Sequence, residues 1–315
     1  MSVKSDSLRE PVLQVKDLSV SFHMYDTGLE QYDLKVISNL SLDVKPGEIV
    51  AIAGSSGSGK SLLAHAVMGL LPENAAISGE MLYKGEILTQ KKKETLRGTE
   101  IALVPQSVAY LDPSMRIGCQ VLGEHPGAEK RNAQKEVFER FKLDEKIEKY
   151  YPFQLSGGMA RRVLVSTAII SGAQLIIADE PTPGLDLEMA LEALQCFREM
   201  ADSGKSVILI THDIDLAFHV ADRVAVFYAG TTVEMAPSSD FITGPSALRH
   251  PYSKALWNAL PQNGFEPIPG FQPYAKTLPK GCLFSPRCPF RTKECEEKIP
   301  MQELRGGTVR CIHAT

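Results

Sequence analysis

The stretch from Gly54 to Ser61 narrows the choice of fold more than any other part of the sequence. It reads Gly-Ser-Ser-Gly-Ser-Gly-Lys-Ser and matches the pattern G-x-x-x-x-G-K-[ST]. The apolar run 48–53 before it predicts a short buried strand, and residues 61–70 after it predict a helix. Between a strand and a helix, the glycines of such a loop let successive backbone N–H groups surround a phosphate. The sequence therefore predicts a nucleotide-binding α/β unit, whose phosphates are held by Gly54, Ser55, Ser56, Gly57, Ser58, Gly59, Lys60 and Ser61.

Two carboxylates that follow another apolar run complete a predicted ATP site. The run 175–178 ends in Asp179 and Glu180, and the carboxyl ends of strands face the nucleotide crevice in an α/β sheet. We expect Lys60 to reach the β- and γ-phosphates, and Ser61 and Asp179 to hold Mg²⁺. Glu180 is then placed to polarise the attacking water as a general base. ATP and Mg²⁺ are thus the expected cofactors.

Short apolar runs separated by helical stretches predict a parallel sheet. Residues 107–165 lack long β-branched runs and predict a helical subdomain between segments of that sheet, with a helix over 133–151. Alternation of apolar and polar residues predicts half-buried strands nearer the start of the chain. The predicted buried strands are 48–53, 174–178, 206–210 and 223–227, the half-buried strands are 12–22 and 40–44, and further helices are 160–169 and 187–201.

Composition changes near residue 240, where prolines and cysteines begin to concentrate. We therefore predict a flexible tail over 1–11, an ATPase domain over 12–240 and a small Cys-rich extension over 241–315. The 34 basic and 38 acidic residues give a net charge of −4, which provides no overall basic field for nucleic acid. The N-terminal residues are polar, which argues against a signal peptide, and no apolar window is long enough to span a membrane. We therefore expect a cytoplasmic chain.

A second glycine loop, Leu155-Ser-Gly-Gly-Met159, precedes a helix-like segment and predicts another anion site. A chain with only one P-loop can also contain a second anion-binding loop if that loop binds the nucleotide held by another subunit. Here the sequence resembles the ATP-binding-cassette (ABC) ATPases, in which the signature LSGGQ of one subunit covers the nucleotide on the P-loop of the other. The resemblance implies that Ser156, Gly157 and Gly158 bind the nucleotide of a partner. Met159 departs from the family's glutamine, a change associated with the peptide/nickel importer branch.

The resemblance spans residues 12–240 and implies a P-loop α/β core with an antiparallel β subdomain and a helical subdomain. It also implies further catalytic residues. Gln106, in Ala-Leu-Val-Pro-Gln106, matches the glutamine that links Mg²⁺ and the attacking water to the helical subdomain. His212, in Ile-Leu-Ile-Thr-His212, matches the histidine that contacts the γ-phosphate. Together with Glu180, these two residues form the catalytic set that the resemblance implies, and Gln106 is also an expected Mg²⁺ ligand.

Three other residues are placed at the nucleotide by the resemblance. Asp186 stands in Pro183-Gly-Leu-Asp186, at the position of the family's D-loop, where Pro-Gly departs from the usual pattern. The sequence does not predict how this departure affects the coupling between the two ATPase subunits. Either Phe22 or Tyr25 is expected to be the aromatic residue that stacks on adenine.

The last four cysteines, Cys282, Cys288, Cys295 and Cys311, form a separate candidate metal site. Four thiolates can hold Zn²⁺ or an iron–sulfur cluster, and they can also be structural thiols without metal. The extension resembles that of dipeptide/oligopeptide permease ATPases, some of which carry a [4Fe-4S] cluster, and this favours the cluster over zinc. Cys119 and Cys196 lie in the ATPase body and are expected to be small buried residues.

These features predict an ATP-hydrolysing subunit of an ABC importer for small peptides, nickel or metal chelates, attached to the cytoplasmic face of a membrane. The resemblance implies three kinds of partner: a second ABC ATPase subunit, two membrane permeases, and an extracellular or periplasmic substrate-binding protein. Two alternatives stay open, namely a non-transport ABC ATPase of translation or DNA repair and an ATPase regulated through a redox or iron–sulfur centre. Only about 95 residues separate Lys60 from Ser156, whereas repair ATPases insert long coiled coils there. The sequence does not indicate the substrate, because the substrate-binding pocket belongs to the partner proteins.

Overall fold

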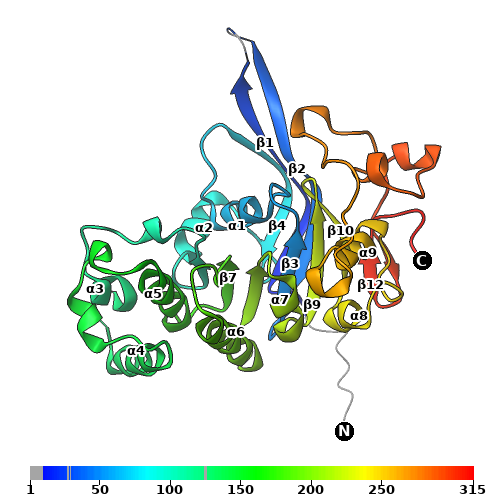
Figure 1. Cartoon of the computed structure of the whole chain (residues 1–315). Coiled ribbons are helices and arrows are strands. Elements are labelled where there is room, and N and C mark those ends of the chain that lie inside the picture. Colours follow the sequence, from blue (N-terminus) through cyan, green and yellow to red (C-terminus); the bar gives the residue numbers. More distant parts are fainter. Residues whose placement is uncertain (1–9, 27, 29, 124–125) are drawn as a thin grey trace.

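The computed structural model describes residues 10–26, 28, 30–123 and 126–315 and is shown in Figure 1. The tail predicted over 1–11 lies, as far as residue 9, outside the described residues. The helices are α1 Lys60–Met68, α2 Gln90–Leu96, α3 Ile117–Leu122, α4 Ala128–Arg140, α5 Gly157–Ile170, α6 Leu187–Asp202, α7 Ile214–Val220, α8 Ser238–Thr243 and α9 Pro251–Asn258. The strands are β1 Leu13–Tyr25, β2 Gln31–Val44, β3 Ile49–Gly54, β4 Ala75–Tyr83, β5 Glu86–Ile87, β6 Ile101–Val104, β7 Leu175–Asp179, β8 Ser206–Ile210, β9 Arg223–Tyr228, β10 Thr231–Pro237, β11 Gln302–Leu304 and β12 Gly307–Val309.

The larger sheet is the predicted P-loop α/β sheet, with strand order β11-β12-β10-β9-β3-β8-β7-β6. Its strands from β9 to β6 run parallel, with β3 between β8 and β9. Successive residues of β3 pack on opposite faces, because side chains alternate along a strand. Ala51 and Ala53 join the cluster beneath α5 and α6, whereas Val50 and Ile52 join the cluster that contains α1. Both faces of β3 are therefore covered, which explains its continuous apolar sequence.

The smaller sheet, in the order β2-β1-β4-β5, is the antiparallel subdomain. The strands β1 and β2 form the long hairpin at the top of Figure 1, in which Tyr25 pairs with Gln31. The hairpin extends beyond the predicted strands 12–22 and 40–44. Backbone hydrogen bonds between β1 and β2 stabilise the added residues of both strands, and the local sequence of either segment does not indicate this pairing.

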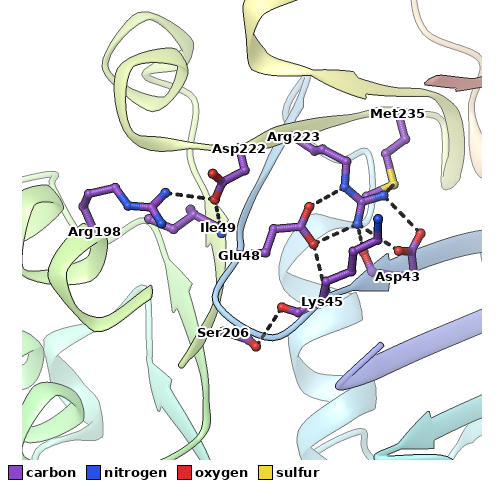
Figure 2. A network of polar contacts seen from close by, with 9 residues as sticks. All are labelled: Asp43, Lys45, Glu48, Ile49, Arg198, Ser206, Asp222, Arg223 and Met235. Carbon is purple, nitrogen blue, oxygen red and sulfur yellow. Dashed lines mark hydrogen bonds and ion pairs between the residues drawn. The ribbon is translucent and has the colours of Figure 1, made fainter. Parts of the chain in front are cut away.

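A polar network joins the antiparallel sheet to the P-loop sheet at the turn before β3, as Figure 2 shows. Arg223 of β9 donates to Asp43 Oδ2 and Glu48 Oε2, both at 2.8 Å. Asp222, the neighbouring residue, accepts the backbone N–H of Ile49 at 2.8 Å. Because Glu48 is only 7% exposed, its charge depends on the guanidinium for compensation. The network therefore fixes the start of the strand that leads into the P-loop.

The helical subdomain contains α3, α4 and α5 and lies at the opposite end of the molecule from the extension in Figure 1. The predicted helix over 133–151 is wrong in its limits, because α4 runs from Ala128 to Arg140. The chain leaves the helix at Lys142, whose φ is +50°. The Asp144 side chain then caps a separate short turn over 145–149.

The two cysteines of the ATPase body differ in burial. Cys196 in α6 is 2% exposed, as predicted. Cys119 in α3 is exposed, so the prediction is wrong for this residue. The buried side of α3 is formed by Ile117 and Val121, and Cys119 lies halfway between them on the other side of the helix.

The extension continues the larger sheet, because β12 pairs with β10 and β11 pairs with β12. These two strands have three residues each, and the sequence contains no strand signal for them. Behind them, Arg249 is 1% exposed and pairs with Glu234 and Asp240, at 3.3 and 2.8 Å. Among the residues that the structure describes, no helix is both long and apolar enough to cross a membrane.

Candidate active site

The P-loop joins β3 to α1 at the carboxyl end of the parallel strands. Gly54, Gly57 and Gly59 have φ values of +154°, +74° and +91°, which side chains rarely tolerate. At Gly54, an added Cβ would lie 2.3 Å from the carbonyl oxygen of Phe227, so only glycine fits against β9 there. The loop lines a cavity of about 440 Å³, together with Phe22, Gln106, Glu180 and His212. The structure thus brings together side chains that lie up to 190 residues apart in the sequence.

Lys60, the first residue of α1, is hydrogen-bonded to the backbone of the P-loop. Its Nζ donates to the carbonyl oxygens of Gly54 and Ser55, at 2.8 and 3.0 Å. Burial lowers the pKa of Lys60, whereas the nearby carboxylates of Glu180 and Asp179 raise it. A desolvated ammonium group beside backbone N–H groups is suited to receive the phosphates of a nucleotide.

Asp179, at the end of β7, has the features of a magnesium ligand. It is 2% exposed, and its Oδ1 atom has no hydrogen-bond partner among the described residues. The Ser61 side chain bonds to the carboxylate, so the two oxygen donors lie together. Burial raises the pKa of Asp179, an effect that the Ser61 hydrogen bond opposes. A buried carboxylate with an unpartnered oxygen and an adjacent hydroxyl fits a hard divalent cation such as Mg²⁺.

Glu180 follows β7 directly and turns toward His212. Its φ is +50°, an uncommon value for a residue with a side chain. Its backbone N–H donates to the carbonyl oxygen of Ile210 at 2.9 Å, which ties it to the end of β8. Glu180 Oε2 lies 2.8 Å from His212 Nδ1, and the Glu180 side chain is 9% exposed against 70% for His212. This geometry orients a carboxylate into the cavity next to a more accessible imidazole.

Gln106 lines the cavity, and Arg161 holds its backbone from behind. Arg161, in α5, donates through Nη1 to the carbonyl oxygen of Pro105 at 2.8 Å and through Nη2 to that of Gln106. It is 7% exposed, and burial lowers its pKa, whereas the charges of Asp179 and Glu180 raise it. The sequence gives Arg161 no role, because an arginine in a helix is usually on a solvated face. The structure instead makes it the link between α5 and Gln106.

The two adenine candidates occupy different positions in β1. Phe22 lines the cavity, where it pairs across the hairpin with Leu34. Tyr25 is 66% exposed, and its hydroxyl accepts a hydrogen bond from Gln31 at 3.1 Å, near the hairpin end. The structure therefore brings Phe22 to the site and leaves Tyr25 outside it.

The second glycine loop lies outside the cavity. The exposed Ser156 caps α5 by accepting the N–H of Met159 at 3.3 Å. Asp186 caps α6 in the same way, since its Oδ1 accepts the N–H of Met189 at 2.9 Å. A Cβ added at Gly158 would lie 3.2 Å from the carbonyl oxygen of Gly184, so the two segments touch. The cavity of this chain is not lined by the second glycine loop, Ser156, Gly157 and Gly158, or by Asp186.

The four C-terminal cysteines lie near one another in the extension, all as free thiols. Burial, which is the largest cause, and the charges of Cys282, Cys288 and Cys295 together raise the pKa of Cys311 to about 11, although the hydrogen bond from the His313 backbone opposes them. Backbone N–H groups of Thr292 and His313 point at Cys295 Sγ and Cys311 Sγ, at 3.5 and 3.3 Å. Among the described residues, however, no three His, Cys, Asp or Glu side chains are arranged to hold one metal ion. The thiols are therefore gathered without the geometry of a mononuclear zinc site.

Comparisons with known proteins match both parts of the chain. Residues 37–183 match the family model described as ABC transporter. Residues 233–295 match the model described as oligopeptide/dipeptide transporter, C-terminal region.

Similar full-length proteins and solved structures are also found. The dipeptide transport ATP-binding protein DppD of Bacillus subtilis is 37% identical over 96% of this chain and 94% of its own length. The oligopeptide transport ATP-binding protein OppD of Salmonella typhimurium is 37% identical over 95% of this chain and 92% of its own length. The dimeric ATP-binding cassette MJ0796, in a post-hydrolysis state bound to ADP and Pi, is 27% identical with a TM-score of 0.62, and covers 72% of this chain and 98% of its own.

Proposed function

The chain belongs to the ABC transporter ATP-binding subunits of the oligopeptide/dipeptide family, and on that basis we propose that it binds and hydrolyses ATP to drive the import of short peptides. The observation that carries the proposal is the convergence of the P-loop, Glu180, His212 and Gln106 on one cavity of about 440 Å³. The chain is an ABC ATPase coupled to transport. The second family match, over residues 233–295, includes part of the extension and supports the peptide-transport branch of this proposal.

Each group of residues at the site has a separate role in ATP hydrolysis. The backbone N–H groups of the P-loop residues that line the cavity, namely Ser56, Gly57, Gly59, Lys60 and Ser61, bind the phosphates together with the Lys60 ammonium. Ser61, Asp179 and Gln106 would hold Mg²⁺, which would supply positive charge to neutralise the phosphates. Glu180 orients and polarises the attacking water as the general base, and His212 contacts the γ-phosphate beside it.

A second cassette is needed to close this site. Ser156, Gly157 and Gly158 lie outside the chain's own cavity, and Ser156 is exposed. We assign these residues, with Asp186, to the nucleotide of a partner ATPase, and the dimer of the similar cassette MJ0796 supports this assignment. ATP then joins the two subunits, and its hydrolysis separates them.

A groove beside the helical subdomain is the proposed contact with the permeases. It has a volume of about 440 Å³ and is lined by residues that include Leu70, Pro105 and Tyr110. Tyr110 is 56% exposed and Leu70 is 37% exposed, so apolar surface is available there. Pro105 precedes Gln106, which gives the groove a direct connection to the nucleotide cavity. The permeases hold the chain at the cytoplasmic face of the membrane.

Short peptides are the proposed substrates, ahead of nickel and metal chelates. The similar proteins DppD and OppD are named for dipeptide and oligopeptide transport, which supports this choice. An external substrate-binding protein would deliver the peptide to the permeases. The ATPase domain over 12–240 would perform the hydrolysis, and the extension over 241–315 would support it.

Peptide-stimulated ATP hydrolysis tests the proposal directly. The transporter, assembled from this chain and its permeases in lipid, is supplied with its binding protein and a short peptide. We expect hydrolysis to rise with peptide in the wild type, and Glu180→Gln to abolish turnover while ATP still binds. If Glu180→Gln hydrolyses ATP at the wild-type rate, the assignment of the base is wrong. If nickel stimulates hydrolysis and peptides do not, the substrate class is wrong.

We propose further that Cys282, Cys288, Cys295 and Cys311 hold a [4Fe-4S] cluster. A cubane binds each thiolate to a different iron, so its ligands stand farther apart than those of one zinc ion. The N–H groups aimed at Cys295 and Cys311 support this choice, because hydrogen bonds to sulfur are a feature of iron–sulfur sites.

Anaerobic purification followed by iron, sulfide and zinc analysis tests the cluster. We expect four iron and four sulfide per chain, as the cubane formula requires, with loss of both in Cys288→Ser. Stoichiometric zinc, or protein that stays free of metal after anaerobic reconstitution, would contradict the proposal.

A further inference from the structure

The hydroxyl of Ser55 makes its contacts with the extension, away from the nucleotide cavity. Ser55 Oγ donates to Gln272 Oε1 at 2.5 Å. The Tyr252 hydroxyl is also hydrogen-bonded to Ser55, at both its side chain and its backbone. Ser55 belongs to the P-loop, whereas both partners come from the segment after residue 240 and are more than 190 residues away in the sequence. The extension therefore touches the phosphate-binding loop itself.

Tyr252 is fixed in place by aromatic packing. It is 1% exposed, and its ring centroid lies 4.5 Å from that of Tyr228 and 5.3 Å from that of Phe284. Burial raises the pKa of Tyr252, so its hydroxyl stays protonated and available for hydrogen bonding. A buried hydroxyl held by rings on two sides has little freedom to move away from Ser55.

Gln272 is fixed by the backbone on either side of it. Arg287, from the cysteine-bearing loop, donates to the carbonyl oxygens of Pro269 and Ile268, at 2.7 and 2.8 Å. On the other side, Lys276 pairs with Asp26 of the hairpin region at 2.8 Å. The short segment that carries Gln272 is therefore held at both ends, which places its amide oxygen at Ser55.

Ser55 also connects the extension to Lys60. Its carbonyl oxygen accepts a hydrogen bond from Lys60 Nζ at 3.0 Å and another from the backbone N–H of Ser58 at 3.2 Å. One residue thus contacts the extension through its side chain and the phosphate-binding lysine through its backbone. A loop that is already in its bound shape loses less conformational entropy when it takes up the nucleotide.

We propose that the extension is part of the ATP site, in which Gln272 and Tyr252 are positioning residues that hold Ser55 and keep the P-loop in its phosphate-binding shape. The inference rests on the proposed binding of ATP at the P-loop, and it assigns the extension a role in setting that affinity. Neither residue lines the nucleotide cavity, so removing either should weaken ATP binding and leave the chemical step largely unchanged.

The test compares the affinity for Mg·ATP and the steady-state constants of Gln272→Ala with those of the wild type, in the full chain assembled with its permeases. Loss of one hydrogen bond should raise both the Kd and the KM for ATP about two- to tenfold, with a smaller change in kcat. Tyr252→Phe, which keeps the ring and removes only the hydroxyl, should act in the same direction. Gln262→Ala, which alters an exposed glutamine of the same extension, is the matched control and should bind ATP as the wild type does.

A double-mutant cycle separates this role from a general loss of stability. Because Gln272 acts through the Ser55 hydroxyl, Ser55→Ala combined with Gln272→Ala should weaken ATP binding no more than the stronger single change does. Independent effects that multiply in the double variant, or unchanged affinity in both Gln272→Ala and Tyr252→Phe, would overturn the inference. If the wild type itself failed to bind ATP, the proposed function would fail as well, so the wild-type measurement distinguishes the two failures.

Discussion

A buried histidine makes the extension sensitive to acid. His250 is 1% exposed and caps α9, where its Nδ1 accepts the N–H of Tyr252 at 2.9 Å. Burial lowers the pKa of His250 from 6.5 to about 3. The folded chain therefore keeps this imidazole neutral at a pH where the unfolded chain protonates it.

The sign and size of the effect follow from these two pKa values. Below pH 6.5 the unfolded state binds more protons, so the free energy of unfolding falls as the pH falls, until the pH reaches about 3. The loss is about 1.4 kcal/mol for each pH unit. Between pH 7.5 and pH 5, His250 should therefore cost about 2 kcal/mol of stability.

His250→Asn tests this account, because asparagine also caps helices but does not titrate near neutral pH. Urea unfolding at pH 7.5 and pH 5 can be followed through Trp257, the single tryptophan, which lies in the helix that His250 caps. We expect the variant to lose about 2 kcal/mol less than the wild type between these pH values. His219→Asn, which removes an exposed histidine, leaves the burial of His250 intact and serves as the control. If the wild type and His250→Asn lost the same stability on acidification, burial of a neutral imidazole would not be the cause.

Three other predictions concern the site and the residues that support it. Arg161→Met should lower kcat about tenfold at nearly unchanged ATP affinity, because a charged hydrogen bond to the backbone of Gln106 is lost; a wild-type kcat would remove Arg161 from the site. Arg223→Met should lower the free energy of unfolding by about 3–5 kcal/mol, and adding Glu48→Gln should recover part of it in a denaturation assay; no recovery would contradict the pairing. Phe22→Ala should weaken ATP binding about two- to tenfold, whereas Tyr25→Ala should not, as titration with a fluorescent ATP analogue would show; the reverse result would place Tyr25 at adenine.

The parts of the fold that the sequence predicts well are those encoded by local pattern. The apolar runs of β3, β7, β8 and β9 are short, continuous and bounded by turns, so their positions follow from hydrophobicity alone. The first half of β2 was not predicted, although Tyr32, Leu34 and Val36 alternate with polar residues there. That signal was available in the sequence.

The contacts that the sequence does not predict are those between distant segments. Nothing near Gln272 indicates that its amide reaches the P-loop, and nothing near Arg161 indicates that it bonds to the backbone of Gln106. The strands β11 and β12 have three residues each, and their pairing with β10 supplies the stability that their sequence lacks. Such features depend on tertiary packing, so only the assembled structure displays them.

Uptake by living cells tests the central claim most directly. The only copy of this chain in the cell is changed to Glu180→Gln, and uptake of a labelled dipeptide, a labelled oligopeptide and nickel, with and without a metallophore, is compared with that of cells carrying the wild type. The account predicts that uptake of a peptide is lost and that the wild-type chain restores it, while nickel uptake is unchanged. Normal uptake of both peptides in the Glu180→Gln cells would contradict the account.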